Sequence, residues 1–195
     1  MILYSAKGSN SSERVEWVLN FKNIPYTKIE VEGEEIVSKY LTMNPYGYVP
    51  SLEIEGNFIS ESMAIIELLE ELYKYPSIFP NNPIEKAMVR EVCEFVNSTI
   101  HAGQNRTLLK YLRDNLTESE KKELRKNWIK LNLIKLEKKL WLKSNFAIGY
   151  DFSLADIFIA SIYKKSLEHG LENIINFQKH LNFLRKNSKI SKSEP

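Results

Sequence analysis

The first 75 residues alternate short apolar runs with segments of helical periodicity. Residues 2–5, Ile-Leu-Tyr-Ser, form an apolar run that predicts a strand, and residues 26–32 alternate apolar and charged positions, which predicts a second strand. Between them a helix is predicted up to Lys22, because apolar residues recur at helical spacing (Val15, Trp17, Val18, Leu19). A strand, a helix and a strand within about 30 residues form a βαβ unit.

A short helix, a hairpin and a longer helix are predicted next. Residues 35–41 predict the short helix. Residues 49–55 and 58–60 predict two strands joined by a turn at Gly56-Asn57. Residues 61–75 then place apolar side chains along one side of a helix. The predicted order of the first part of the chain is therefore β-α-β-α-β-β-α.

The pattern changes after residue 75. Three prolines in residues 76–83 indicate a linker, and the rest of the chain shows only helical periodicity and helix-capping signals. The sequence therefore predicts an α+β protein. Its parts are a first domain over residues 1–75, the linker over residues 76–83, and an all-α helical domain over residues 84–195.

Two Ser/Thr-x-x-acid sequences mark helix starts in the predicted second domain. Thr117-Glu118-Ser119-Glu120 predicts a capping box that begins a long amphipathic helix, which extends to Leu142. Ser153-Leu154-Ala155-Asp156 predicts a second capping box directly before an apolar run. A last helix is predicted over residues 171–187, and the Lys-rich residues 187–195 are expected to be frayed.

Charge and composition narrow the class of protein. Residues 1–75 carry six Lys and Arg against twelve Glu, a net charge of −6, and residues 76–195 carry 21 against 13, a net charge of +8. Because Lys alternates with Glu along residues 118–139, the basic charge favours solvated helix faces over a nucleic-acid surface. No apolar run approaches the ~18 residues that span a membrane, and the first residues lack the pattern of a signal peptide. With Cys93 as the single cysteine, these features predict a cytoplasmic protein without a metal site.

Three segments, in order along the chain, resemble motifs of the cytosolic glutathione transferase family. Residues 44–52 look like the segment N-P-x-x-x-V-P-x-L of that family, and residues 61–66 look like its (E/Q)-S-x-A-I turn. Gly149 followed by Ser153-Leu154-Ala155-Asp156 looks like its G-x-x-x-(S/T)-x-A-D motif. The resemblance extends over nearly the whole chain. It implies a thioredoxin-like first domain, a helical second domain, and glutathione as the bound thiol.

Within this family, local segments resemble the zeta class, which includes maleylacetoacetate isomerases. The similar segments are residues 2–5, Ser9, Arg14-Val15, and Ile100 with Gln104-Asn105. The class has Ser-Ser-Cys before its first helix, whereas here Asn10 and Ser11 follow Ser9, and Glu13 stands where Trp is usual. These departures favour a general transferase over an isomerase.

The serines before the first helix are candidates to activate a thiol. A free thiol has a pKa of about 8.5, so little of it is ionised at neutral pH. A hydroxyl group at a helix N-terminus stabilises a thiolate through a hydrogen bond and the aligned peptide dipoles. Ser9, which resembles the catalytic serine of the family, is the first candidate and Ser11 the second. The alternative for Ser11 and Ser12 is that one of them simply caps the helix.

The resemblance also implies how glutathione is held. Val49 precedes Pro50. In the family the bond before the equivalent proline is cis, and the backbone of the residue before that proline, here Val49, pairs with the glutathione cysteine like an added strand. Glu61 suits the ammonium group of glutathione, and Ser62 suits its γ-glutamyl carboxylate. The alternative for Glu61 and Ser62 is an ordinary helix cap.

The resemblance also implies a role for two residues of the helical domain. His101 and Asn105 lie one turn apart on a predicted helix, and the resemblance implies that they face glutathione and the pocket of the second substrate. For His101 the alternative is a solvated helix residue. Nothing in the sequence distinguishes the two possibilities.

The first hypothesis is therefore an enzyme, a glutathione transferase that joins the glutathione thiolate to an electrophilic small molecule. Two alternatives are a non-catalytic regulatory or protein-binding module of the same fold and a maleylacetoacetate isomerase-like enzyme. A homodimer is expected as well. Family members pair the first domain of one subunit with the helical domain of the other, and the opposite net charges of the two domains favour that pairing.

Overall fold

A computed structural model describes residues 1–195, except for the side chain of Glu35, and its contacts divide the chain into two units. The first unit contains Met1–Ser77 together with Asn187–Pro195, and the second contains Ile78–Lys186. In the described residues, strands occur only in the first unit and the second is helical. The predicted α+β fold, a thioredoxin-like part followed by a helical part, is confirmed.

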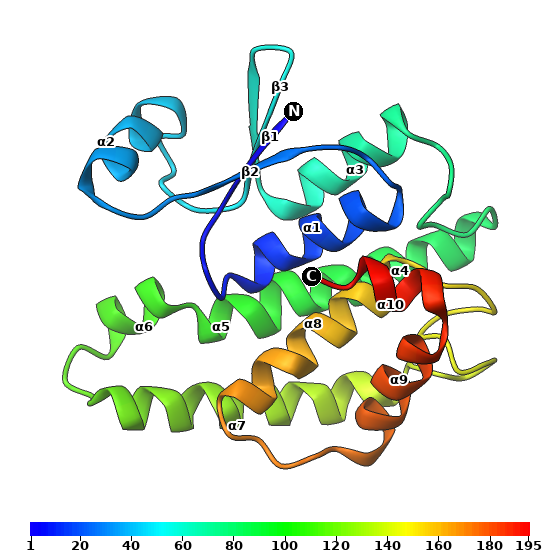
Figure 1. Cartoon of the computed structure of the whole chain (residues 1–195). Helices are drawn as coiled ribbons and strands as arrows, with labels where there is room; N and C mark the ends of the chain where they lie inside the picture. The colour runs from blue at the N-terminus through cyan, green and yellow to red at the C-terminus, as the bar shows by residue number, and fades with distance from the viewer. The chain divides into compact units, whose positions relative to one another are not determined.

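A four-stranded mixed sheet forms the centre of the first unit (Figure 1). Its strand order is β2-β1-β3-β4. β1 runs parallel to β2 and antiparallel to β3, and β3 runs antiparallel to β4. The strands are β1 (Ile2–Ser5), β2 (Thr27–Glu30), β3 (Ser51–Ile54) and β4 (Asn57–Ser60).

Helices cover both faces of this sheet (Figure 1). Leu3 of β1 pairs with Leu52 of β3 on the face that is covered by α1 (Asn10–Phe21) and α3 (Ser62–Leu72). Apolar side chains of both helices are fully buried there (Val15, Val18, Leu19, Ile65, Ile66, Leu69). On the opposite face, the ring of Tyr4 lies 5.5 Å from that of Tyr40 in α2 (Glu34–Met43) and 5.3 Å from that of Phe58.

The hairpin turn differs by one residue from the prediction. Ile54 pairs with Asn57, so the two central residues are Glu55 and Gly56, not Gly56 and Asn57. Their φ angles are 50° and 75°, as a two-residue type I′ turn requires. The prediction was wrong because Gly56 fits either central position, and only the strand register decides between them.

The C-terminal residues are ordered, which contradicts the predicted fraying. Asn187 caps a short helix, α10 (Ser188–Ser193), by accepting hydrogen bonds from two backbone N–H groups. Trp17 of α1 donates its Nε1–H to the Ser193 hydroxyl at 3.1 Å, and Asn20 donates to the Ser193 carbonyl at 3.1 Å. The sequence pattern of this Lys-rich end shows no such contacts, because its partners lie about 170 residues away along the chain.

The second unit packs its helices around one strongly apolar helix, α8 (Leu154–Glu168). None of the helices in the described residues is long and apolar enough to cross a membrane. Cys93 is buried. The predicted helix from residue 118 ends at Glu137 instead of Leu142, and the last predicted helix begins at Ile175. The elements are α4 (Pro83–Glu94), the π-helix η1 (Phe95–His101), α5 (Ala102–Gln104), α6 (Arg106–Leu112), α7 (Glu118–Glu137), α8 (Leu154–Glu168) and α9 (Ile175–Lys186).

Both predicted capping boxes are present. The Thr117–Glu120 box begins α7 at an exposed position. The second box begins α8 and is buried, because Asp156 is inaccessible to solvent. Asp156 accepts hydrogen bonds from both the backbone N–H and the hydroxyl group of Ser153, and a further one from the Ala147 N–H at 2.8 Å. His180 of α9 contacts the same carboxylate at 2.8 Å, a partner that the sequence did not indicate.

Candidate functional site

Three segments of the first unit meet at one end of the sheet. Tyr4 pairs with Ser51, and Ser51 pairs with Ser60, so the end of β1, the start of β3 and the end of β4 lie at the same edge. The segments that continue from these strand ends carry five of the predicted site residues (Ser9, Val49, Pro50, Glu61, Ser62). The topology therefore gathers residues from three distant parts of the sequence.

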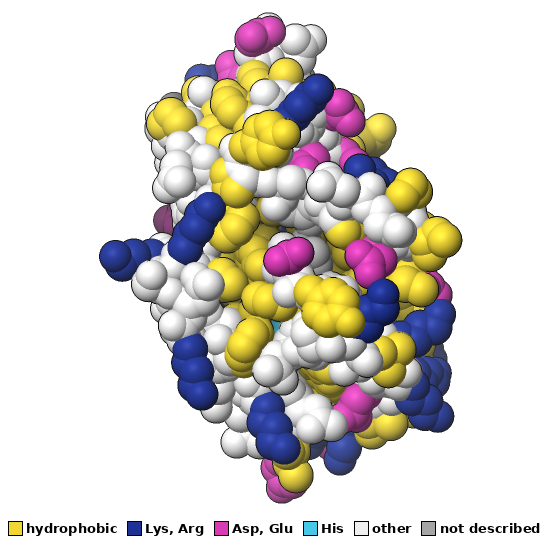
Figure 2. Space-filling model, turned by 90° about the vertical axis from the view of Figure 1, so that its right-hand side faces the viewer, with side chains coloured by type: hydrophobic (Ala, Val, Ile, Leu, Met, Phe, Trp, Pro, Cys, Tyr) yellow, Lys and Arg dark blue, Asp and Glu magenta, His cyan; other side chains and the backbone are white. Residues whose placement is uncertain are grey.

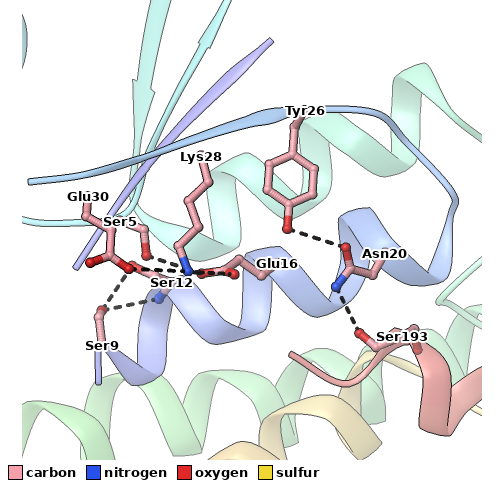
Figure 3. Close-up of polar contacts among 9 residues, drawn as sticks. All are labelled: Ser5, Ser9, Ser12, Glu16, Asn20, Tyr26, Lys28, Glu30 and Ser193. Carbon is pink, nitrogen blue, oxygen red and sulfur yellow. Dashed lines mark hydrogen bonds and ion pairs between the residues drawn. The ribbon is translucent and has the colours of Figure 1, made fainter. Parts of the chain in front are cut away.

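Ser9 caps α1 and keeps its own hydroxyl proton for another acceptor. Its Oγ accepts hydrogen bonds from the Ser12 backbone N–H at 3.3 Å and from the Ser12 hydroxyl at 3.0 Å (Figure 3). Both bonds use lone pairs of Ser9, and no other described residue bonds to its side chain. The half-buried Ser9 hydroxyl can therefore cap the helix and donate a hydrogen bond outward at the same time.

Two other hydroxyl groups lie near this loop, and that of Tyr4 is already engaged. Ser11 lies within the first turn of α1, one position after the helix begins, so it does not cap the helix. Tyr4 donates its phenol proton to Glu53 at 2.9 Å. Burial and this carboxylate raise the pKa of Tyr4 to about 12. A phenol whose proton is already held by a carboxylate is poorly placed to stabilise a thiolate.

A buried carboxylate fixes the strands and the helix that flank the Ser9 loop. Glu16 of α1, only 8% exposed, accepts a hydrogen bond from the Ser5 hydroxyl at 3.2 Å and pairs with Lys28 of β2 at 3.0 Å (Figure 3). A charge this deeply buried is stable only when it is paired. These contacts tie the ends of β1 and β2 to α1. The sequence analysis missed Glu16, whose one signal was an acidic residue among apolar positions.

The peptide bond between Val49 and Pro50 is cis, as the resemblance implied. Val49 is half-buried and lies just before β3. Its backbone N–H and C=O have no hydrogen-bond partner among the described residues. Backbone groups left open beside a strand can bind an extended peptide as an additional strand. The loop that carries Val49 is anchored by buried polar residues, chiefly Tyr40 and Asn44, which the sequence analysis also missed.

The start of α3 has no side-chain cap. Glu61 occupies the N-cap position with a φ angle of 70°, and its exposed side chain makes no capping hydrogen bond. An ordinary cap, the alternative considered for Glu61 and Ser62, is therefore not formed. A non-glycine residue at such a φ angle costs about 1–3 kcal/mol, and here it turns the chain from β4 into α3. Ser62 is 2% exposed and lies at the first helical position, where backbone N–H groups suit a carboxylate.

His101 and Asn105 belong to the second unit. His101 ends the π-helix η1, and its Nδ1 lies 3.1 Å from the Gln104 side-chain amide. Asn105 caps α6, because its Oδ1 accepts hydrogen bonds from two backbone N–H groups. A π-helix turn often marks a functional position, which is compatible with the predicted role of His101. The capping contacts give Asn105 a structural role in addition to the predicted one.

The polar groups at this end of the sheet are mainly hydroxyl and backbone N–H groups. Within the described part of the chain, no group of three or more His, Cys, Asp or Glu side chains is arranged to hold a metal ion. The site at the end of the sheet instead offers hydroxyl groups and backbone N–H groups. Such groups bind carboxylates, amides and a thiolate, and these are the functional groups of a small acidic thiol peptide.

Comparisons with known proteins place the chain in a family. A family model described as the glutathione S-transferase N-terminal domain matches residues 3–77. The chain is 34% identical over 163 residues to the probable maleylacetoacetate isomerase 1 of Drosophila melanogaster. The match covers 80% of this chain and 65% of that protein. It is also 34% identical over 161 residues to a zeta-class glutathione S-transferase of Euphorbia esula, which covers 80% of this chain and 72% of that protein.

A solved structure is similar over the whole chain. It is the maleylacetoacetate isomerase of Anaeromyxobacter dehalogenans 2CP-1 with glutathione bound in its active site, and it superposes with a TM-score of 0.85. The two sequences are 26% identical, and the match covers 100% of this chain and 94% of the other. The chain therefore belongs to the glutathione transferase family of enzymes, and zeta-class members are among its relatives.

Proposed function

We propose that this chain is a glutathione-dependent enzyme of the zeta type that isomerises a small unsaturated acid. The observation that carries glutathione binding is the meeting of Ser9, the open backbone of Val49 and the uncapped start of α3 at one end of the sheet. The names of the relatives favour the isomerase, the second alternative from the sequence, over conjugation to a general electrophile.

Each residue of the proposed site has a chemical task. Ser9 would donate a hydrogen bond to the sulfur and hold it as the thiolate at neutral pH. The open backbone groups of Val49 would pair with the cysteine residue of glutathione. Glu61 and Ser62 would bind the γ-glutamyl ammonium and carboxylate groups.

Two residues of the second unit are candidates for binding the second substrate. We propose that His101 and Asn105 contribute to the pocket of the second substrate. When bound, glutathione supplies a thiolate that would add to one carbon of a conjugated double bond. The carbon–carbon bond is then single and can rotate, and loss of the thiolate restores the double bond in the other geometry. Conjugation to an activated double bond would begin with the same addition, and the two activities would then differ in whether the carbon–sulfur bond breaks again. Conjugation to an aryl halide would instead end with loss of the halide. Glutathione is also the main thiol of reducing compartments, which agrees with a cytoplasmic location for this protein.

Two assays separate the three hypotheses. We expect the protein to be retained on immobilised glutathione and to convert maleylacetoacetate to its trans isomer with catalytic amounts of glutathione. Stoichiometric consumption of glutathione with an aryl halide, without isomerisation, would favour the general transferase. Retention without either reaction would favour the non-catalytic module. Failure to bind glutathione at all would contradict the proposal.

We also propose that the protein forms a homodimer. Large apolar side chains stay exposed in each unit, and hydrophobic side chains are visible on the face drawn in Figure 2. The opposite charges of residues 1–75 and 76–195 favour pairing of the first part of one copy with the second part of another. Light scattering at micromolar concentration should therefore give twice the chain mass of 22.8 kDa. A mass of one chain would contradict the dimer.

A further inference from the structure

The carbonyl group of Tyr48 is held by two buried side chains. The Tyr40 hydroxyl lies 2.6 Å from this carbonyl, and the Asn44 side-chain amide lies 2.9 Å from it. Tyr40 is 1% exposed and Asn44 is 2% exposed, so neither donor has water as an alternative partner. Two short hydrogen bonds to one backbone oxygen fix its direction.

This carbonyl group belongs to the same peptide plane as the N–H of Val49. The peptide bond between Tyr48 and Val49 is trans, since the cis bonds among the described residues are those before Pro50 and Pro76. In a trans peptide the C=O and the N–H point in opposite directions. Holding the Tyr48 oxygen toward Tyr40 and Asn44 therefore turns the Val49 N–H away from these side chains. Tyr40 and Asn44 therefore set the direction of the Val49 N–H through the Tyr48 carbonyl.

Tyr40, Asn44, Ser51 and Ser60 form a cluster of hydrogen-bonded side chains beside Tyr48. Its hydroxyl groups all donate in the same direction, toward the Tyr48 carbonyl. A backbone carbonyl can only accept, so the Tyr40 hydroxyl donates to Tyr48, and its oxygen is left to accept from the Ser51 hydroxyl at 2.8 Å. The Ser51 oxygen in turn accepts from the Ser60 hydroxyl at 3.0 Å and from Asn44 at 3.0 Å. Hydrogen bonds arranged head to tail polarise and strengthen one another.

The same cluster reaches both segments that are proposed to hold glutathione. Its first end is the Tyr48 carbonyl, next to Val49, and its other end is Ser60, next to Glu61. Ser51 and Ser60 are also direct partners in the register of β3 and β4. A shift at one end would therefore be transmitted to the other through the buried hydroxyl of Ser51.

We propose that Tyr40 and Asn44, supported by Ser51, are positioning residues that aim the Val49 backbone at the glutathione cysteine. This inference rests on the proposed function, because it assumes that glutathione pairs with Val49. None of the three side chains needs to touch the ligand. They act by fixing one peptide plane, so their loss weakens binding without changing the group that ionises the thiol.

The main test is Tyr40→Phe, which removes one hydroxyl and keeps the ring that contacts Tyr4. We expect the dissociation constant of glutathione, measured by calorimetry, to rise about tenfold, as the loss of one buried hydrogen bond predicts. The pKa of the bound thiol and the kcat at saturating glutathione should stay unchanged. Ser51→Ala, which removes the middle of the chain of hydroxyl groups, should raise the dissociation constant less, and Ser60→Ala should raise it least.

Tyr26→Phe is the matched control. Tyr26 also donates one phenol hydrogen bond inside the first unit, to Asn20 at 3.3 Å, but it has no link to the Val49 loop (Figure 3). It should lower the melting temperature slightly and leave glutathione binding unchanged. An equal loss of binding in Tyr26→Phe and Tyr40→Phe would overturn the proposal, because it would reveal a general loss of stability.

The outcomes distinguish this inference from the proposed function. If the wild-type chain does not bind glutathione, the proposed function is wrong. If the wild type binds and Tyr40→Phe binds equally well, only the positioning role is wrong. Should Tyr40→Phe not fold, unchanged affinity in Ser51→Ala would overturn the role in the same way.

Discussion

Ser9→Ala should bind glutathione but lose the stabilised thiolate. We expect the thiol in the variant complex to titrate near its free value of about 8.5, and the wild-type complex to titrate well below it. Turnover near neutral pH should fall about 10–100-fold, since each unit of pKa changes the thiolate fraction up to tenfold. Activity should recover partly as the pH rises, because the thiol then ionises without help. The thiolate ultraviolet absorbance of the complex, followed against pH, measures the shift directly.

The double role of Ser9 makes controls necessary. Because Ser9 also caps α1, its loss should cost about 0.5–2 kcal/mol of stability as well. Ser9→Thr keeps a hydroxyl group and should restore much of the thiolate shift. Tyr4→Phe should leave the titration of the bound thiol unchanged. Tyr4 donates its proton to Glu53, and its pKa is raised to about 12, so it stays protonated near neutral pH. Overlapping curves for wild type and Ser9→Ala would exclude Ser9, and Ser11 would then be tested next.

The order of the elements could be predicted from the sequence because it depends on local periodicity. The strand at residues 2–5 and both capping boxes have the predicted positions, since a hydrophobic alternation or a Ser/Thr-x-x-acid pattern acts within a few residues. Element ends were less predictable. The serines were expected to precede the first helix, but α1 begins at Asn10 and includes Ser11 and Ser12, because Ser9 caps it.

The contacts that build the candidate site could not be predicted from local pattern. Tyr40 and Asn44 have no signal that shows them bonding to the Tyr48 carbonyl. Glu16 meets Lys28 only after the βαβ unit has folded. The cis bond before Pro50 followed from the family resemblance, because an ordinary X–Pro bond is cis in only ~5–6% of cases. Local sequence patterns therefore identify candidate residues, and the tertiary structure determines which of them lie close together.

The short helix at the C-terminus shows the same limit on a larger scale. Its Lys-rich sequence predicts a frayed end, yet Ser193 bonds to both Trp17 and Asn20. Lys189 also lies over the ring of Phe21, 4.4 Å from its centre. Since these partners come from the other end of the chain, only tertiary structure shows that the first unit includes both termini.

Asp156→Ala should destabilise the protein far more than the loss of an ordinary helix cap. Asp156 is fully buried and accepts hydrogen bonds from two backbone N–H groups and the Ser153 hydroxyl, besides its contact with His180. Its removal leaves these donors unpaired in the interior. The expected cost is about 3–5 kcal/mol, since each buried donor left without an acceptor costs about 1–3 kcal/mol, and the melting temperature should fall by roughly 6–20 °C.

The exposed capping box of α7 provides the matched control. Glu120 makes the same reciprocal contacts with Thr117, but at the surface, where water can replace them. Glu120→Ala should therefore lower the melting temperature much less than Asp156→Ala. Glutathione affinity per folded molecule should be unchanged in both variants, because the hydrogen-bond partners of Asp156 and Glu120 include none of the residues proposed to hold glutathione. An intact melting temperature with lost glutathione binding in Asp156→Ala would instead identify this carboxylate as part of the binding site.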